Sequence, residues 1–128
     1  GMSRTKTFTL DEARELLPEL RDRLIAMQVN WQNLAPYQKE VRQLAMKIDK
    51  GGSTISDAGK YLSLAKKLKS QLTYFENMSI EVKDITSGLV DFPFIREGRI
   101  VYLCWKMSEE TISHWHETDA GLAGRQPI

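Results

Sequence analysis

The sequence has little of what stabilises a secreted or membrane protein. Its 128 residues include one cysteine, Cys104, so an intrachain disulfide is excluded. No apolar run is long enough for a transmembrane helix, and no segment has the charged-then-apolar pattern of a secretory signal. We therefore expect no membrane partner and a location in the reducing cytoplasm.

The sequence also lacks an excess of either charge. Lys and Arg number 18 and Asp and Glu 17, a formal net charge of +1, so bulk charge does not drive binding to nucleic acid. The nearest approach to a basic patch has no aromatic platform beside it, and we interpret it as a solvated face. It consists of Lys60, Lys66, Lys67 and Lys69. We expect no specific nucleic-acid binding.

The N-terminal third of the chain has the pattern of one long helix. Thr9 stands three residues before Glu12, which is the spacing of a capping box and predicts a helix start at Leu10. Apolar residues then recur at alternating steps of three and four, a heptad pattern typical of coiled-coil-like helices. This apolar stripe comprises Leu10, Ala13, Leu17, Leu20, Leu24, Met27, Trp31, Leu34, Val41, Ala45 and Ile48.

Two prolines lie inside this pattern. Pro18 and Pro36 each remove a backbone donor and predict a kink. Asn33 offers an alternative, a break in which it caps a new helix with Pro36 in the first turn. Because the heptad register continues across the gap, we favour one long kinked helix.

A second, shorter helix follows a glycine-containing loop. Ser56 is its expected cap, and apolar residues from 58 to 75 repeat the three-four spacing, which predicts an antiparallel helical hairpin over residues 8–79. The first helix outruns the second, so half of its stripe has no helical partner. Either the C-terminal segment or a second copy of the chain must cover it. We predict a homo-oligomer, a dimer, with an interface made by Leu17, Leu20, Leu24 and Met27.

Residues 80–128 have the pattern of short strands, turns and an ordered tail. Pro93 should lie at a sheet edge or a bulge. Residues 108–116 fit a short helix or a strand. Three segments rich in β-branched and aromatic residues predict a small antiparallel β-element: 80–83, 89–95 and 99–105. Segment 99–105 has apolar side chains on both faces, so both of its faces should be covered.

Motifs at both ends of the chain resemble those of a known family. They are Phe8-Thr-Leu-Asp-Glu-Ala, Leu16-Leu-Pro-Glu-Leu, Gly88-Leu-Val-Asp-Phe-Pro, Val101-Tyr-Leu-Cys-Trp, Trp115-His-Glu and Gly124-Arg-Gln-Pro. With them the chain resembles the bacterial and archaeal family called domain of unknown function 2203. The resemblance covers nearly the whole chain and implies no established activity.

Reactive side chains gather in the last quarter of the sequence. If the segment from His114 to His116 is extended, both imidazoles lie on one face. Together with Glu117, Cys104 or Asp119 they would suit zinc or another borderline divalent ion. If the segment is helical, the imidazoles point apart and the site is lost. The alternative interpretation is that the histidines hydrogen-bond to backbone or carboxylates and hold the tail in place.

Two further chemistries are less well supported by the pattern. Cys104 has candidate partners for thiol catalysis in the two histidines, but a mid-strand cysteine usually behaves as a small buried hydrophobe, so we assign no catalytic residue. Arg125, in a glycine-containing tail, can bind an anion or anchor the tail by pairing with Asp91, Glu117 or Asp119.

The sequence thus predicts a single domain of the α+β class over residues 1–128. Its parts are a long kinked antiparallel helical hairpin, a small C-terminal antiparallel β-element and an ordered tail. The favoured function is a non-enzymatic, self-associating scaffold or interaction protein. The alternative is a small metal-binding protein or metal-dependent enzyme that uses His114, His116 and Glu117.

Overall fold

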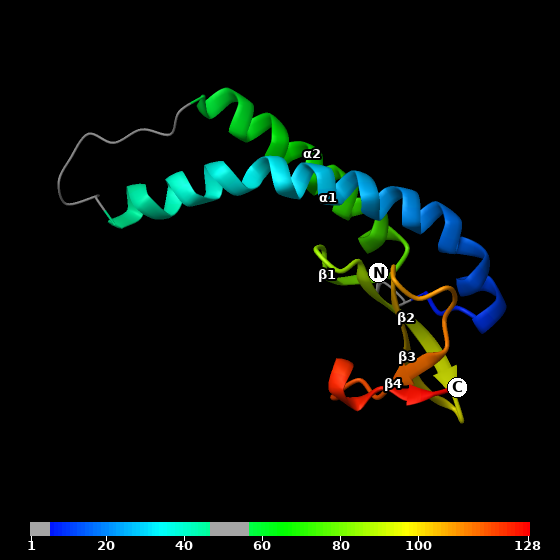
Figure 1. Cartoon of the computed structure of the whole chain (residues 1–128). Coiled ribbons are helices and arrows are strands. Elements are labelled where there is room, and N and C mark those ends of the chain that lie inside the picture. The colour runs from blue at the N-terminus through cyan, green and yellow to red at the C-terminus, as the bar shows by residue number, and fades with distance from the viewer. Residues whose placement is uncertain (1–5, 47–56) are drawn as a thin grey trace, which may run out of the picture.

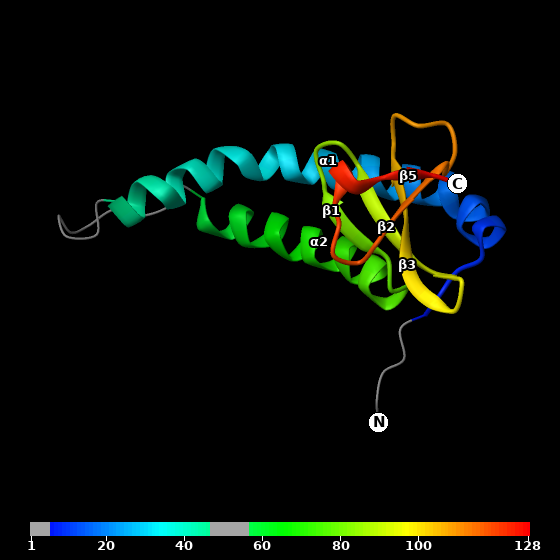
Figure 2. The same ribbon diagram turned by 90° about the horizontal axis from the view of Figure 1, so that it is seen from below.

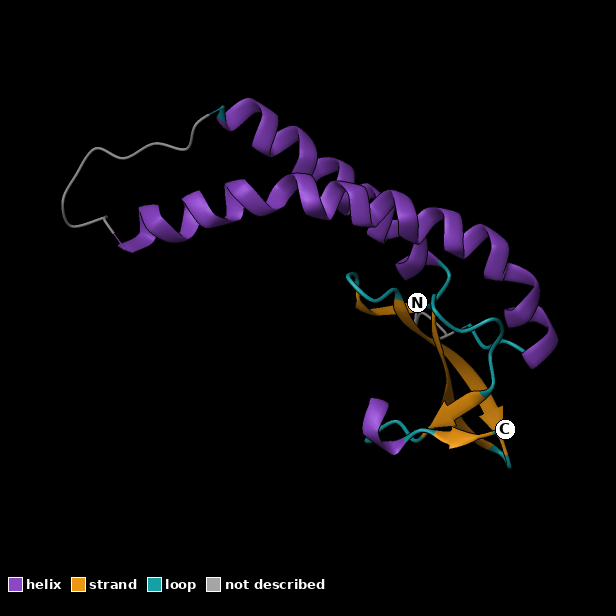
Figure 3. Cartoon of the chain, viewed as in Figure 1, coloured by secondary structure: helices purple, strands orange, loops and turns teal. Residues whose placement is uncertain are grey.

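The computed structural model describes residues 6–46 and 57–128, which form two layers (Figures 1 and 3). Two helices make one layer, and a five-stranded antiparallel sheet of strand order β1-β2-β3-β4-β5 makes the other. The elements are α1 (Leu10–Met46), α2 (Ala58–Asn77), β1 (Glu81–Asp84), β2 (Leu89–Arg96), β3 (Arg99–Lys106), β4 (His114–His116), a 3-10 turn η2 (Leu122–Gly124) and β5 (Gln126–Pro127). The predicted α+β class is confirmed.

Helix α1 begins where the capping box predicts. The Thr9 N–H donates to Oε1 of Glu12 at 2.8 Å, and the Glu12 N–H donates to Oγ1 of Thr9 at 3.1 Å. The helix is continuous for 37 residues through Pro18 and Pro36, so the alternative break at Asn33 is wrong. Both prolines are exposed, so water can bond to the carbonyls that lose their helical partners. The predicted end of this helix, near residue 49, falls outside the described residues.

Helix α2 packs antiparallel beside α1. The side chain of Asp57 caps it by accepting the Lys60 N–H at 3.1 Å, so the cap position belongs to Asp57, and the predicted cap, Ser56, lies outside the described residues. Between the helices the buried Asn30 side chain donates to Oε1 of Gln71 at 2.8 Å. A polar pair such as this within an apolar helix interface favours one register of the hairpin. Within the described residues no helix combines the length and apolarity that a membrane span needs.

The sheet is a meander centred on the β2-β3 hairpin. Its two-residue turn, Glu97-Gly98, has φ of 51° and 78°, the left-handed values that a tight hairpin requires. Pro93 lies past the end of β1, and its carbonyl accepts the Phe8 N–H at 2.9 Å, which ties the start of the chain to β2. Residues 108–113 form a turn, bends and irregular loop, and the chain becomes a strand at β4.

The inner face of the sheet covers the N-terminal half of the apolar stripe of α1. Ala13, Leu17, Leu20, Leu24 and Met27 are at most 5% exposed, and they share one hydrophobic cluster with Phe92, Val101, Leu103, Trp105 and Trp115 of the sheet. The C-terminal segment is therefore what covers the stripe. This corrects the assignment of Leu17, Leu20, Leu24 and Met27 to an oligomer interface, because the sheet of the same chain buries them.

Polar side chains of α1 fasten the two layers at their margins. The Arg14 guanidinium donates to the carbonyl of Ile112 at 2.7 Å, and the amide of Gln28 donates to the carbonyl of Ile85 at 3.0 Å. Both carbonyls belong to loops at the sheet margin, and that of Ile85 also accepts the Gly88 N–H at 3.1 Å. The hydrogen bonds therefore satisfy loop backbone and hold the sheet at one position along the helix.

We predict that Leu20→Ala destabilises the isolated chain by about 2–5 kcal/mol, because Leu20 is fully buried beneath the sheet. Leu62→Ala is the matched control: Leu62 is 58% exposed, and its truncation should cost less than about 1 kcal/mol. Urea denaturation measures both. Equal losses in the two variants would contradict this packing.

Candidate metal centre

The outer face of the sheet, turned away from the helices, carries a row of polar side chains. Asp91 on β2 pairs with Cys104 on β3, and Cys104 pairs with His114 on β4. Because side chains alternate along a strand, all three lie on one face, as does His116 two residues further on. Asp91 and Cys104 are each 1% exposed and His116 is 3% exposed. Three chemically reactive side chains are thus buried on the face opposite the core.

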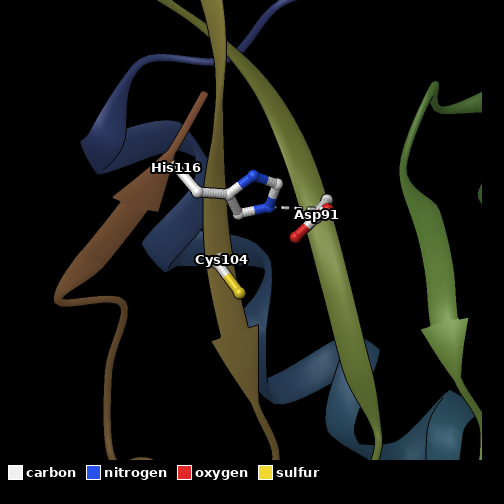
Figure 4. A group of neighbouring side chains, drawn as sticks. All are labelled: Asp91, Cys104 and His116. Carbon is white, nitrogen blue, oxygen red and sulfur yellow. Dashed lines mark hydrogen bonds and ion pairs between the residues drawn. The ribbon is translucent and has the colours of Figure 1, made fainter. Parts of the chain in front are cut away.

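These three side chains meet at one point (Figure 4). Nε2 of His116 lies 2.9 Å from Oδ2 of Asp91, so the histidine reaches across β3 to the far strand. One ligand atom from each of Asp91, Cys104 and His116 lies within 4.8 Å of the others. Helix α1 passes behind the strands, on the other side of the sheet. The cluster is therefore separate from the hydrophobic core.

The hydrogen bonds of His116 determine where its protons lie. Nδ1 is 2.7 Å from the carbonyl oxygen of Glu117, which only accepts, so Nδ1 carries a hydrogen. Nε2 faces a carboxylate oxygen at 2.9 Å, and that contact requires a proton between the two atoms, held by the ring or by the carboxyl. Burial raises the pKa of Asp91, against the opposing influence of His116. Among the described residues, no N–H or O–H group donates to the other carboxylate oxygen, Oδ1, and the weakly donating Cys104 thiol also hydrogen-bonds to this carboxylate.

Cys104 lies between these two groups in a low-dielectric environment. Burial, with a smaller contribution from the charge of Asp91, raises the pKa of the Cys104 thiol to about 11. A buried thiol with this pKa is protonated near neutral pH and is a poor nucleophile. The cysteine therefore fits a packing or metal-binding role rather than thiol catalysis.

The C-terminal tail lies on the same outer face, as Figures 1 and 2 both show. Nη2 of Arg125 is 2.7 and 2.8 Å from the two carboxylate oxygens of Glu109 and 3.2 Å from the carbonyl of Cys104. Against the effect of burial, this contact lowers the pKa of Glu109. Arg125 therefore anchors the tail by pairing with Glu109, and not with the predicted partners Asp91, Glu117 or Asp119.

The remaining predicted ligands lie apart from the cluster. Glu117 is paired with Arg99, whose hydrogen bond lowers the pKa of that carboxyl, and Asp119 is exposed. His114 is on the correct face, but its Nδ1 lies 3.0 Å from Oγ of Ser113. Of the predicted metal ligands, the structure brings together His116 and Cys104.

The third member, Asp91, was not predicted as a ligand. The sequence signal for Asp91 is a lone carboxylate in the apolar run Leu89-Val-Asp-Phe-Pro. A carboxylate in a buried strand is costly unless another group pairs with it. Nitrogen, sulfur and oxygen donors at one point suit a borderline divalent cation such as zinc.

Comparison with known proteins supplies the family. A model of the family described as Uncharacterized conserved protein (DUF2203) matches residues 6–128, so the chain belongs to this family and the resemblance seen in its motifs is confirmed. No curated protein and no solved structure matches the chain. The function must therefore be argued from the geometry of the outer face.

The burial and raised pKa of Cys104 predict a thiol that is inert in the folded protein. At about pH 8, an aromatic disulfide reagent should modify wild-type protein only after denaturant is added. Ser108→Cys, at an exposed position, supplies a control thiol that should react at once in the same fold. Rapid modification of one thiol per native wild-type chain would contradict the arrangement.

Proposed function

We propose that this member of the DUF2203 family binds one divalent cation of the zinc class through Asp91, Cys104 and His116. The observation that supports the proposal is the convergence of three different donor atoms from three neighbouring strands at a buried point. Ligands on hydrogen-bonded strands are held more precisely than ligands on loops. The sheet then acts as the frame of a metal site.

The surroundings of each donor fit a cation. Nδ1–H of His116 is held by a backbone carbonyl, the contact that orients metal-binding histidines and leaves Nε2 to face the ion. Within the described part of the chain, Oδ1 of Asp91 is a buried acceptor with no N–H or O–H partner, and the carboxylate has only the weak donor of the Cys104 thiol beside His116. A buried acceptor without a strong donor costs about 1–3 kcal/mol unless something binds it. A cation bound between Nε2 of His116 and Oδ2 of Asp91 replaces the proton that these two atoms share. It also gives the Asp91 carboxylate, including Oδ1, a positively charged neighbour.

The donor set also favours one class of ion over another. Magnesium and calcium prefer six or more oxygen ligands, whereas a thiolate and an imidazole favour zinc, cobalt and similar ions. Binding requires the Cys104 thiol to lose its proton, so the ion displaces a proton from sulfur as well as the one shared with Asp91. Affinity should therefore rise with pH.

Burial of the cluster points to a structural or sensing role rather than catalysis. Catalytic zinc sites keep one position open to water or substrate, while structural sites are closed. The three donor residues are at most 3% exposed, and the tail lies over this face. A non-enzymatic function therefore remains the better interpretation.

Protein purified without a histidine tag or chelator should be stabilised by zinc and unaffected by magnesium. At a free zinc concentration of about 100 times Kd, the free energy of unfolding should rise by about 2.7 kcal/mol. Cys104→Ala and Asp91→Asn should lose this response, whereas Glu117→Gln, at the exposed pair with Arg99, should keep it. Thermal unfolding with and without each ion measures these responses. A wild-type protein whose stability does not change with zinc would refute the proposal.

A second candidate function, self-association, has support in an exposed strip of α1. Ile25 and Val29 stand one turn apart and are 47% and 51% exposed. They lie away from the buried residues Leu24 and Met27, so the sheet does not cover them. We propose this strip as the contact between two copies of the chain, in place of the buried stripe.

Replacement of Ile25 and Val29 with lysine should convert a dimer to a monomer without unfolding it, since both side chains are half exposed in the single chain. Light scattering at tens of micromolar measures the mass, and circular dichroism reports the fold. Leu62→Lys is a control on the other helix. A monomeric wild type would contradict this second proposal.

A further inference from the structure

We infer that His114 is the fourth ligand of the proposed metal site and reaches it by a rotation of its side chain. The inference rests on the proposed function, because it concerns the same ion. It makes the site a closed set of one carboxylate, one thiolate and two imidazoles.

The register of the sheet places His114 within reach. It is the direct cross-strand partner of Cys104, and both side chains lie on the outer face. Direct partners in an antiparallel pair have Cβ atoms about 4.5–5.5 Å apart, a separation that an imidazole spans. Asp91 is the partner of Cys104 on the other side, so the thiol lies between a carboxylate and an imidazole in one row.

The present contacts of His114 leave it free to turn. Its side chain is 33% exposed, and Nδ1 lies 3.7 Å from Oε2 of Glu109, too far for a hydrogen bond. Its closer contact, at 3.0 Å, is to the hydroxyl of the adjacent Ser113, which can turn toward water instead. Rotation of the imidazole therefore breaks no strong interaction.

Other side chains near the row are less suitable. The carboxylate of Glu109 is held by Arg125 and also accepts the Lys106 N–H at 2.8 Å. Recruiting it would release the tail and leave the arginine without its partner.

Charge also favours His114. With a divalent cation, the carboxylate of Asp91 and the thiolate of Cys104 already bring the net charge to zero. A neutral imidazole keeps it there, whereas a second carboxylate would leave a buried negative charge, which is costly. A set of two histidines, one cysteine and one aspartate also gives the tetrahedral coordination that zinc favours.

Cobalt(II) is the probe that tests the fourth ligand, because its visible absorption reports coordination number and its near-ultraviolet band reports a thiolate. We expect wild-type protein to give an intense four-coordinate spectrum that added imidazole does not change. In His114→Ala, affinity should fall by more than about tenfold, since even loss of a residue that merely supports a ligand costs that much. Free imidazole should then restore the wild-type spectrum by filling the vacated position.

Two further variants separate the possible results. Asp119→Ala, exposed on the tail, should behave as wild type, and His114→Gln keeps a polar side chain of similar size if the alanine variant folds poorly. If wild-type protein binds neither cobalt nor zinc, the proposed function is wrong. If wild-type protein binds both ions, and His114→Gln and His114→Ala bind cobalt as tightly as wild type and with the same spectrum, the proposed site stands and His114 is not its ligand.

Discussion

The proton between His116 and Asp91 is the feature on which the chemistry of the outer face depends. It joins β4 to β2 across β3 at 2.9 Å, in surroundings where neither group is accessible to water. A buried polar pair of this kind is seldom a net gain in stability over apolar side chains of the same volume. This supports our proposal that the pair forms part of a cation site, with Cys104 as a third donor.

One sheet performs two tasks because its strands alternate. Val101, Leu103 and Trp105 point inward and cover the stripe of α1, which removes the need for a second chain there. The residues between them point outward, and Cys104 is one of these. The same hydrogen-bond ladder that fixes the core thus fixes the spacing of the proposed metal donors. A slip of one residue in register would exchange the two faces and destroy both.

Local patterns in the sequence predicted the helices, the capping box and three of the strands, because those signals depend on neighbours a few residues apart. The tight turn at Glu97-Gly98 is also a local signal, and it sets the pairing of Asp91 with Cys104. The position of His116 could not be predicted, since the segment before β4 has no periodicity and its pairing depends on tertiary contacts. For the same reason, the sequence did not show that the sheet covers α1, and the assignment of Leu17, Leu20, Leu24 and Met27 to an oligomer interface was wrong. Sequence alone therefore located the reactive quarter of the chain but not the donor set.

The most direct test of the central claim is a crystal structure of the wild-type protein grown with zinc, with anomalous data collected on both sides of the zinc absorption edge. We expect one strong anomalous peak between β2 and β4, at a bonding distance of about 2.0–2.3 Å from Oδ of Asp91, Sγ of Cys104 and Nε2 of His116. A zinc ion bound elsewhere, with the hydrogen bond between His116 and Asp91 intact, would contradict it.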